Sequence, residues 1–330
     1  MNENFIKEIE IKNFKCFEYF KANGFKRVNL IGGKNNVGKT AFMEACWINE
    51  LNKKNDTLVH SFVNMVNAMT LIEQFRHALN YDNHDLHVAF SILKKFNNMS
   101  IQSNNNSVKL NIEVKDLDVI VKINDSELGT SLTSPNLFEN ILSDKKIPYE
   151  NFIPSCKIDN DLMIILYDRI KENRKRNQLN QYISEFDSEI LEFEIINNLP
   201  KVFLDSRKQF ENLAELGHGL KRYISIISAI LVHQDSCLFL DEIENGIHYT
   251  RLDRLWEIIL ILSEELNCQI FATTHSKECI EAYYRVSKKL DDEDICFIEL
   301  GKVKGEIKAL VLDKEMFLFE LEQSHEVRGW

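Results

Sequence analysis

Apolar residues recur along this chain at two spacings, which together predict an α/β fold. Three short, mainly apolar runs have the length of buried strands: 28–31, 237–240 and 269–273. Three longer segments carry apolar residues every three or four positions, as helices with one buried face do: 41–51, 223–231 and 252–266. Buried strands interspersed with such helices favour a mainly parallel sheet with helices packed against it.

Residues 5–17 follow a different spacing from the runs above. Ile9 and Ile11 alternate with charged residues, which predicts a strand that buries one face. We expect this strand to form the margin of the sheet together with the strand at 28–31. Near the other end of the chain, the pattern predicts two strands and a final helix: 294–300, 305–312 and 313 to about 325.

The middle of the chain predicts an insertion into this α/β core. Its segments read in turn as mostly helical, as two alternating strands, as loops and as a helix: 52–98, 108–114 with 117–123, 124–148 and 162–170. We therefore expect a single domain over 1–330. Residues 1–51 and 200–330 would form its core, and residues 52–199 an insertion of helices and a small antiparallel sheet.

A glycine-rich segment follows the run at 28–31. Residues 33–40 read Gly-Lys-Asn-Asn-Val-Gly-Lys-Thr, the phosphate-binding pattern G-x-x-x-x-G-K-T, placed between a predicted strand and a predicted helix. The glycines let the backbone turn closely around a phosphate, so that loop N–H groups and the helix N-terminus point at the anion. Lys39 should reach the β- and γ-phosphates, and Thr40 should hold Mg²⁺. The expected nucleotide-binding residues of this loop are Gly33, Asn35, Asn36, Val37, Gly38, Lys39, Thr40 and Ala41.

Polar features follow or precede the other predicted elements. Asp241 and Glu242 come directly after the run at 237–240, and the carboxyl ends of strands are where open α/β sheets bind ligands. Residues 216–222 read Leu-Gly-His-Gly-Leu-Lys-Arg and open a helix, whose N-terminus can attract an anion. His275 follows the run at 269–273. Taken singly, each has an ordinary structural alternative: a strand-end turn, a helix cap or a structural histidine.

The order of these motifs resembles that of ABC-type ATPases of the SMC and OLD (overcoming-lysogenization-defect) group. The opening, a strand, Asn-Phe-Lys-Cys-Phe at 13–17, a second strand and the P-loop, is similar to that group. So are Asp-Glu-Ile-Glu-Asn-Gly at 241–246, in the D-loop region, and Thr-Thr-His-Ser at 273–276. A transporter-type D-loop would have aspartate at His248, and this chain does not. The resemblance covers residues 5–50 and 200–325.

The resemblance implies a role for each polar feature. Asp241 would hold Mg²⁺ through water, Glu242 would orient and polarise the attacking water, and His275 would bond the γ-phosphate. With Lys39, the expected catalytic residues are Glu242 and His275; the expected metal ligands are Thr40 and Asp241. The ABC signature corresponds to Gly217, His218 and Gly219, which would bind the γ-phosphate held by the other subunit of a dimer. This turn lacks the serine that the family commonly has.

The resemblance also implies a fold and a function. The fold is an α/β P-loop NTPase of the ABC-type head class, with a mixed or parallel central sheet, an antiparallel β subdomain and a helical insertion. The function is that of a Mg²⁺-dependent ATPase that closes as a homodimer with ATP at the interface and acts as a conformational switch. Stand-alone proteins of this type resemble the sensor subunit of bacterial anti-phage defence systems. The chain is too short to include the Toprim nuclease of OLD proteins, so a nuclease or toxin effector would be a separate protein.

Composition narrows the range of partners. The chain has 330 residues, with 40 basic against 51 acidic side chains and a net charge of −11. This balance argues against a surface built mainly for nucleic-acid phosphates, although it does not exclude a local basic stripe that binds them. The basic cluster at 171–176 fits a solvated helix face better than a nucleic-acid contact. The seven cysteines contain no C-x-x-C pair, and neither a signal peptide nor a membrane span is evident, so we expect a cytoplasmic protein.

Two other functions remain open at this stage. One is an SMC-group ATPase of DNA repair or chromosome maintenance, which salt-dependent DNA binding would favour. The other is the nucleotide-binding subunit of a transporter, which co-purification with a membrane protein would favour. The D-loop sequence and the long insertion argue against the transporter.

Overall fold

The computed structural model describes residues 4–51, 98–115, 118–124, 126–131, 150–155 and 158–322. The helical pattern expected over 52–98 lies outside these residues except at its last position, and most of the loop expected over 124–148 does too. In the described part of the chain no helix is both long and apolar enough to cross a membrane.

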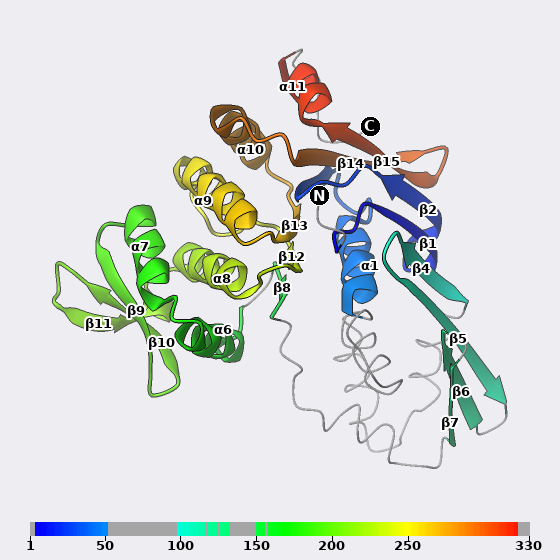
Figure 1. The fold of residues 1–330 in the computed structure, drawn as a ribbon, viewed down its shortest axis with the longest axis horizontal. Coiled ribbons are helices and arrows are strands. Elements are labelled where there is room, and N and C mark those ends of the chain that lie inside the picture. The colour runs from blue at the N-terminus through cyan, green and yellow to red at the C-terminus, as the bar shows by residue number, and fades with distance from the viewer. Residues whose placement is uncertain are drawn as a thin grey trace.

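A six-stranded mixed sheet lies at the centre of the fold (Figure 1). Its strands, in spatial order, are β15 (Glu306–Asp313), β14 (Ile295–Val303), β3 (Val28–Gly33), β13 (Gln269–Thr273), β12 (Cys237–Leu240) and β8 (Phe152–Ile153). Neighbouring strands are parallel except for β14 and β15, which form an antiparallel pair. The strands expected at 28–31, 237–240, 269–273, 294–300 and 305–312 are therefore confirmed.

Both faces of the central sheet are buried, which is why its strands read as short apolar runs. Side chains alternate between two cores: Leu238 and Leu240 belong to one, and Cys237 and Phe239 belong to the other. The first core is covered by three helices, α8 (His218–Val232), α9 (Leu252–Glu265) and α10 (Lys277–Leu290). The second is covered by α1 (Lys39–Leu51). Helix α10 was not expected from the sequence pattern.

A second, antiparallel sheet packs on the outer side of α1 (Figure 1). Its strands, in spatial order, are β2 (Phe17–Asn23), β1 (Glu8–Phe14), β4 (Met99–Ser103), β5 (Ser107–Lys115), β6 (Asp118–Ile123) and β7 (Ser126–Ser131). The expectation that 5–17 joins the strand at 28–31 was wrong: β1 pairs with β2 and β4, because both edges of β3 are occupied by β13 and β14. Strand β7 also replaces the start of the loop expected from residue 124.

A smaller unit packs beside α8 (Figure 1). It consists of α6 (Asn160–Glu172), α7 (Arg176–Phe186) and a sheet of β9 (Ile190–Ile196), β10 (Leu199–Leu204) and β11 (Gln209–Asn212). This sheet continues across position 200, where the sequence pattern placed the start of the core. The division into core and insertion stays a prediction. The chain ends its described part with α11 (Lys314–Glu322).

The basic cluster between α6 and α7 is largely engaged within the chain. Lys171 pairs with Asp168 at 2.7 Å, and Lys175 donates to the carbonyl of Leu231 at 2.8 Å. Arg176 pairs with the carboxylates of β9. These contacts favour the structural interpretation of the cluster over a nucleic-acid contact.

Candidate functional site

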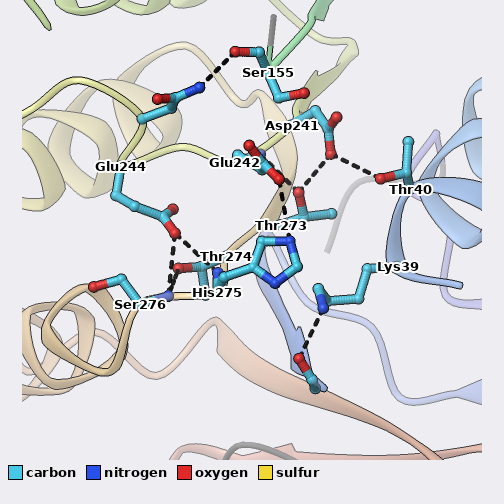
Figure 2. Close-up of polar contacts among 12 residues, drawn as sticks. Lys39, Thr40, Ser155, Asp241, Glu242, Glu244, Thr273, Thr274, His275 and Ser276 are labelled. Carbon is cyan, nitrogen blue, oxygen red and sulfur yellow. Dashed lines mark hydrogen bonds and ion pairs between the residues drawn. The ribbon is translucent and has the colours of Figure 1, made fainter. Parts of the chain in front are cut away.

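The predicted motifs meet at one edge of the central sheet. Strands β3, β13 and β12 are parallel neighbours, so the loops after their carboxyl ends lie side by side. These loops carry the P-loop, His275, and the pair Asp241 and Glu242 (Figure 2).

The P-loop backbone needs its two glycines. Gly33 and Gly38 have φ angles of 137° and 93°, in the region that favours glycine. A Cβ on Gly33 would lie 2.4 Å from the carbonyl oxygen of Leu300, and one on Gly38 would lie 2.8 Å from Cys16 Sγ. The loop is therefore fitted closely against β14 and against the turn between β1 and β2.

The other predicted loop residues differ in what their side chains can do. Val37 and Ala41 bury their side chains in the core between the two large sheets, so only their backbone can face a phosphate. The side chains of Asn35 and Asn36 are exposed, and Asn36 has a positive φ of 61°.

Lys39 is buried at the base of the loop. Its ammonium donates to the carbonyl oxygens of Gly33 at 2.7 Å and Lys34 at 2.8 Å, so it lies within the turn of the loop. Burial lowers the pKa of Lys39 to about 8, while the carboxylates of Glu242, Glu244 and Asp241 act in the opposite direction. A phosphate bound in the loop would add a counter-charge at this ammonium.

Asp241 is held by two hydroxyl groups. Thr40 Oγ1 donates to Asp241 Oδ1 at 3.2 Å, and Thr273 Oγ1 donates to the same oxygen at 2.7 Å (Figure 2). Asp241 is buried and Thr40 is exposed. The structure thus brings together the two residues predicted as metal ligands, with hydroxyl and carboxylate oxygens at the surface of the site.

Glu242 has an unusual backbone conformation, and two backbone contacts and one side-chain contact hold the residue in place. Its φ is 47°, a left-handed conformation that is uncommon for a residue other than glycine. Its N–H donates to Thr273 Oγ1 at 2.8 Å, its carbonyl accepts from Arg222 at 3.2 Å, and Oε1 lies 3.1 Å from His275 Nε2. The two side chains predicted to act on water and on the γ-phosphate are therefore in contact (Figure 2).

Sequence reasoning missed three residues that support this edge. Thr273 bridges Asp241 and the backbone of Glu242, and buried Arg222 donates to the carbonyls of Pro154, Asp241 and Glu242. Glu244 accepts from the backbone N–H groups of His275 and Ser276. The signals were present in the sequence, as a polar residue at a strand end, an arginine in an apolar helix and a second glutamate after Asp-Glu, but none has a fixed spacing to its partner.

The signature-like turn lies at a separate groove of about 480 Å³. Gly217 and His218 are exposed at the N-terminus of α8, where no side chain caps the helix. Gly219 instead packs on the D-loop: a Cβ there would lie 2.0 Å from the carbonyl oxygen of Gly246. None of the described residues that line this groove belongs to the P-loop. Within one chain, therefore, the structure does not bring the turn into the site at the sheet edge.

Family comparisons agree with this architecture. Residues 28–281 match the family model described as AAA domain, putative AbiEii toxin, Type IV TA system, and residues 5–49 match an AAA ATPase domain. An ATP/GTP phosphatase of Helicobacter pylori is 28% identical over 331 residues, covering 87% of this chain and 89% of that protein.

Solved structures show the same fold at low sequence identity. One is an Smc head bound to the C-winged helix domain of ScpA, with a TM-score of 0.54, 13% identity, and coverage of 94% of this chain and 98% of that one. Another is an Smc head domain with an extended coiled coil bound to the C-terminal domain of ScpA, derived from Pyrococcus furiosus. Its TM-score is 0.54, with 10% identity and coverage of 97% and 99%. The expected ABC-type head class is confirmed.

Proposed function

We propose that this chain, a P-loop ATPase that belongs to the family described as AAA domain, putative AbiEii toxin, Type IV TA system, is a Mg²⁺-dependent switch that closes as a homodimer around ATP. One observation carries the proposal: Lys39, Thr40, Asp241, Glu242 and His275 converge at the carboxyl edge of three parallel strands. Together they would supply the parts of phosphoryl transfer: a cation for the phosphates, oxygen ligands for Mg²⁺, a carboxylate for the attacking water and a contact to the γ-phosphate.

Charge placement supports ATP hydrolysis by these residues. The ammonium of Lys39 would balance the β- and γ-phosphates inside the turn of the loop. Glu242 Oε1 would accept a hydrogen bond from the attacking water, and its contact with His275 Nε2 at 3.1 Å fixes the direction in which the carboxylate points. His275 is exposed beside it and would contact the γ-phosphate, as the resemblance to ABC-type ATPases implies.

The donor set at the site fits Mg²⁺. Thr40 Oγ1 and Asp241 Oδ1 are hard oxygen donors within 3.2 Å of each other, and Mg²⁺ in nucleotide sites is typically held by few protein oxygens together with phosphate oxygens and water. Bound there, the ion would neutralise phosphate charge. Thr273 keeps Asp241 oriented toward Thr40 through its own hydrogen bond to Oδ1 at 2.7 Å.

The separate position of the signature-like turn supports a shared site. Gly217 and His218 expose the N-terminus of a 15-residue helix, which favours an anion. Because this turn borders its own groove and not the P-loop, a phosphate that used both would have to lie between two copies of the chain. Arg222, in the same helix, donates to the backbone carbonyls after β12, so a movement of α8 would shift the backbone of Asp241 and Glu242.

Glu242→Gln should bind ATP but hydrolyse it about a hundredfold more slowly, because the amide keeps the shape of the side chain and loses the base. The ATP-bound dimer should then accumulate. Light scattering with and without ATP measures this, and Glu257→Gln, a partly exposed carboxylate of α9 that pairs with Arg254 and Lys289, serves as the control. A mass that stays at the monomer value with ATP bound would contradict the dimer.

ATP binding should take up a proton at alkaline pH. Burial lowers the pKa of Lys39 to about 8, and a bound phosphate favours the charged form, so the pKa rises on binding. The affinity for ATP should therefore fall as the pH rises above about 8. Calorimetry in buffers of different ionisation enthalpy should detect uptake at about pH 8.5 and much less at about pH 7. Equal heats in all buffers at the higher pH would contradict a charged Lys39 at the phosphates.

A defence role is the biological function that we favour. The family description names a putative toxin of a toxin–antitoxin system, which supports a role that depends on a second protein. We propose that ATP-driven closure acts as the sensor step and that a separate nuclease or toxin acts as the effector, in the cytoplasm. The neighbouring genes and co-purifying proteins are the test. A DNA-maintenance role has less support, since the basic cluster at α6 and α7 is largely engaged by contacts within the chain.

A further inference from the structure

We propose that Glu244 is a positioning residue for His275: its carboxylate fixes the backbone from which the imidazole reaches Glu242. The inference rests on the proposed ATPase function and goes beyond the residues assigned to it above. Among the described residues, the carboxylate of Glu244 makes its hydrogen bonds to the backbone of the loop after β13 and not to the side chains of Asp241 or Glu242, so it acts through that loop (Figure 2).

The contacts of Glu244 are concentrated on one oxygen. Oε1 accepts from the N–H of His275 at 2.9 Å and from the N–H of Ser276 at 3.1 Å. Oε2 is buried and has no hydrogen-bond partner in the part of the chain that the structure describes. A buried carboxylate oxygen without a partner is costly, so the two bonds at Oε1 must be held tightly for this arrangement to persist.

A carboxylate suits this position because it lies at the start of α10. Ser276 is the N-cap of that helix, and its Oγ accepts from the N–H of Cys279 at 3.1 Å. Negative charge at a helix N-terminus is stabilised by the helix dipole and by the N–H groups that lack helical partners. Glu244 therefore holds the two N–H groups that precede the helix, while Ser276 holds one inside it.

The other end of Glu244 is anchored as well. The N–H of Ile243 donates to the carbonyl of Thr273 at 3.0 Å, and the N–H of Ile247 donates to the carbonyl of Glu244 at 2.9 Å. Asn245 Nδ2 donates to the carbonyl of Ser155 at 2.7 Å. The turn that carries Glu244 is thus fixed to β13 and to the segment after β8. Its side chain joins the loop after β12 to the loop after β13.

The consequence is geometric control of the contact between His275 and Glu242. The backbone of His275 is held at its N–H, and its Nε2 lies 3.1 Å from Glu242 Oε1. Small misplacements of catalytic groups lower rates steeply. Glu244 also favours the charged form of Lys39, and the experiment must separate this charge effect from positioning.

Four variants of the full chain separate geometry from charge. Glu244→Gln keeps an acceptor oxygen in place and removes the charge, so kcat should stay within about threefold of wild type. Glu244→Ala removes the acceptor, and Glu244→Asp keeps the charge but withdraws the oxygens by one methylene. Both should lower kcat by about tenfold or more, with the Kd for a fluorescent ATP analogue changed by less than about threefold. Ser276→Ala is the matched control, since it removes a cap from the same helix and leaves the N–H of His275 bonded to Glu244.

A double-mutant cycle with His275→Ala decides whether Glu244 acts through the imidazole. If it does, Glu244→Ala should lower kcat in the wild-type background and have little effect in the His275→Ala background. Equal losses in both backgrounds, or a loss in Glu244→Gln as large as in Glu244→Ala, would overturn the positioning role and leave the ATPase proposal intact. If His275→Ala alone has normal kcat, the role of His275 in the proposed function fails first.

Discussion

Replacing Lys39 by alanine should abolish ATP hydrolysis, lowering kcat/KM by about a thousandfold or more, because the loop then loses the ammonium that balances the β- and γ-phosphates. Lys39 is buried within the turn of the loop, where its ammonium donates to the carbonyl oxygens of Gly33 and Lys34. ATPase assays measure the loss of turnover, and titration with a fluorescent ATP analogue measures the loss of nucleotide binding. Wild-type turnover in this variant would refute the P-loop assignment.

The same substitution should leave the fold intact. The pKa of Lys39 in the folded chain is lowered from its ordinary value to about 8, so folding disfavours its charged form. A lowered lysine pKa means that the unfolded state binds more protons than the folded state between about pH 8 and pH 10.5. Removing the side chain therefore removes an unfavourable burial of charge at neutral pH, and thermal unfolding should occur at an equal or higher temperature. A lower transition temperature would show that the loop needs the lysine for folding.

The parts of the site that the sequence could predict are those whose chemistry is local. Gly33 to Thr40 specify a turn by themselves, since glycine conformation and the following helix N-terminus need no distant partner. Asp241 and Glu242 are recognisable because a short apolar run places them at a strand end. In each case the pattern of a few neighbouring residues is sufficient.

The parts that the sequence could not predict depend on which strands are neighbours. Strand β1 has the alternation of a half-buried strand, but alternation does not say that it pairs with β4, in which Ser100, the partner of Lys12, follows 88 positions later. (The same holds for Thr273, which reaches Asp241 only because β13 lies next to β12.) Glu244 reaches the N–H of His275 for the same reason. Topology, and not local pattern, creates these contacts.

The packing of Gly219 determines which residue of the signature-like turn can be substituted to test the shared site. A bulky side chain at Gly219 would meet the carbonyl of Gly246 in the same chain at 2.0 Å, so loss of activity there would not report on a second subunit. His218 is exposed at the first position of α8 and already carries a side chain. His218→Glu adds negative charge where the γ-phosphate of the other subunit would lie, and the helix N-terminus tolerates an acidic residue.

His218→Glu should keep ATP binding to the monomer and lose hydrolysis and ATP-dependent dimerisation together. Lys39, Thr40 and Asp241 are unchanged in the variant, so its own P-loop still binds ATP. His218→Gln is the matched control, because it removes the imidazole without adding charge and should retain most of the activity. ATP titration, turnover and light scattering give the three readouts. Normal hydrolysis by His218→Glu would remove the signature interpretation.

Mixing His218→Glu with Lys39→Ala tests whether each ATP is shared between two chains. In a two-fold symmetric dimer, one site of the mixed dimer combines the intact P-loop of the first variant with the intact turn of the second, and the other site carries both lesions. Activity should therefore return on mixing two inactive proteins, up to about half of the wild-type value. If proven mixed dimers stay inactive, either the turn does not reach the partner's phosphate or the two sites hydrolyse ATP only together. A tethered dimer with one Lys39→Ala P-loop and two intact turns separates these outcomes, since independent sites would leave it half active.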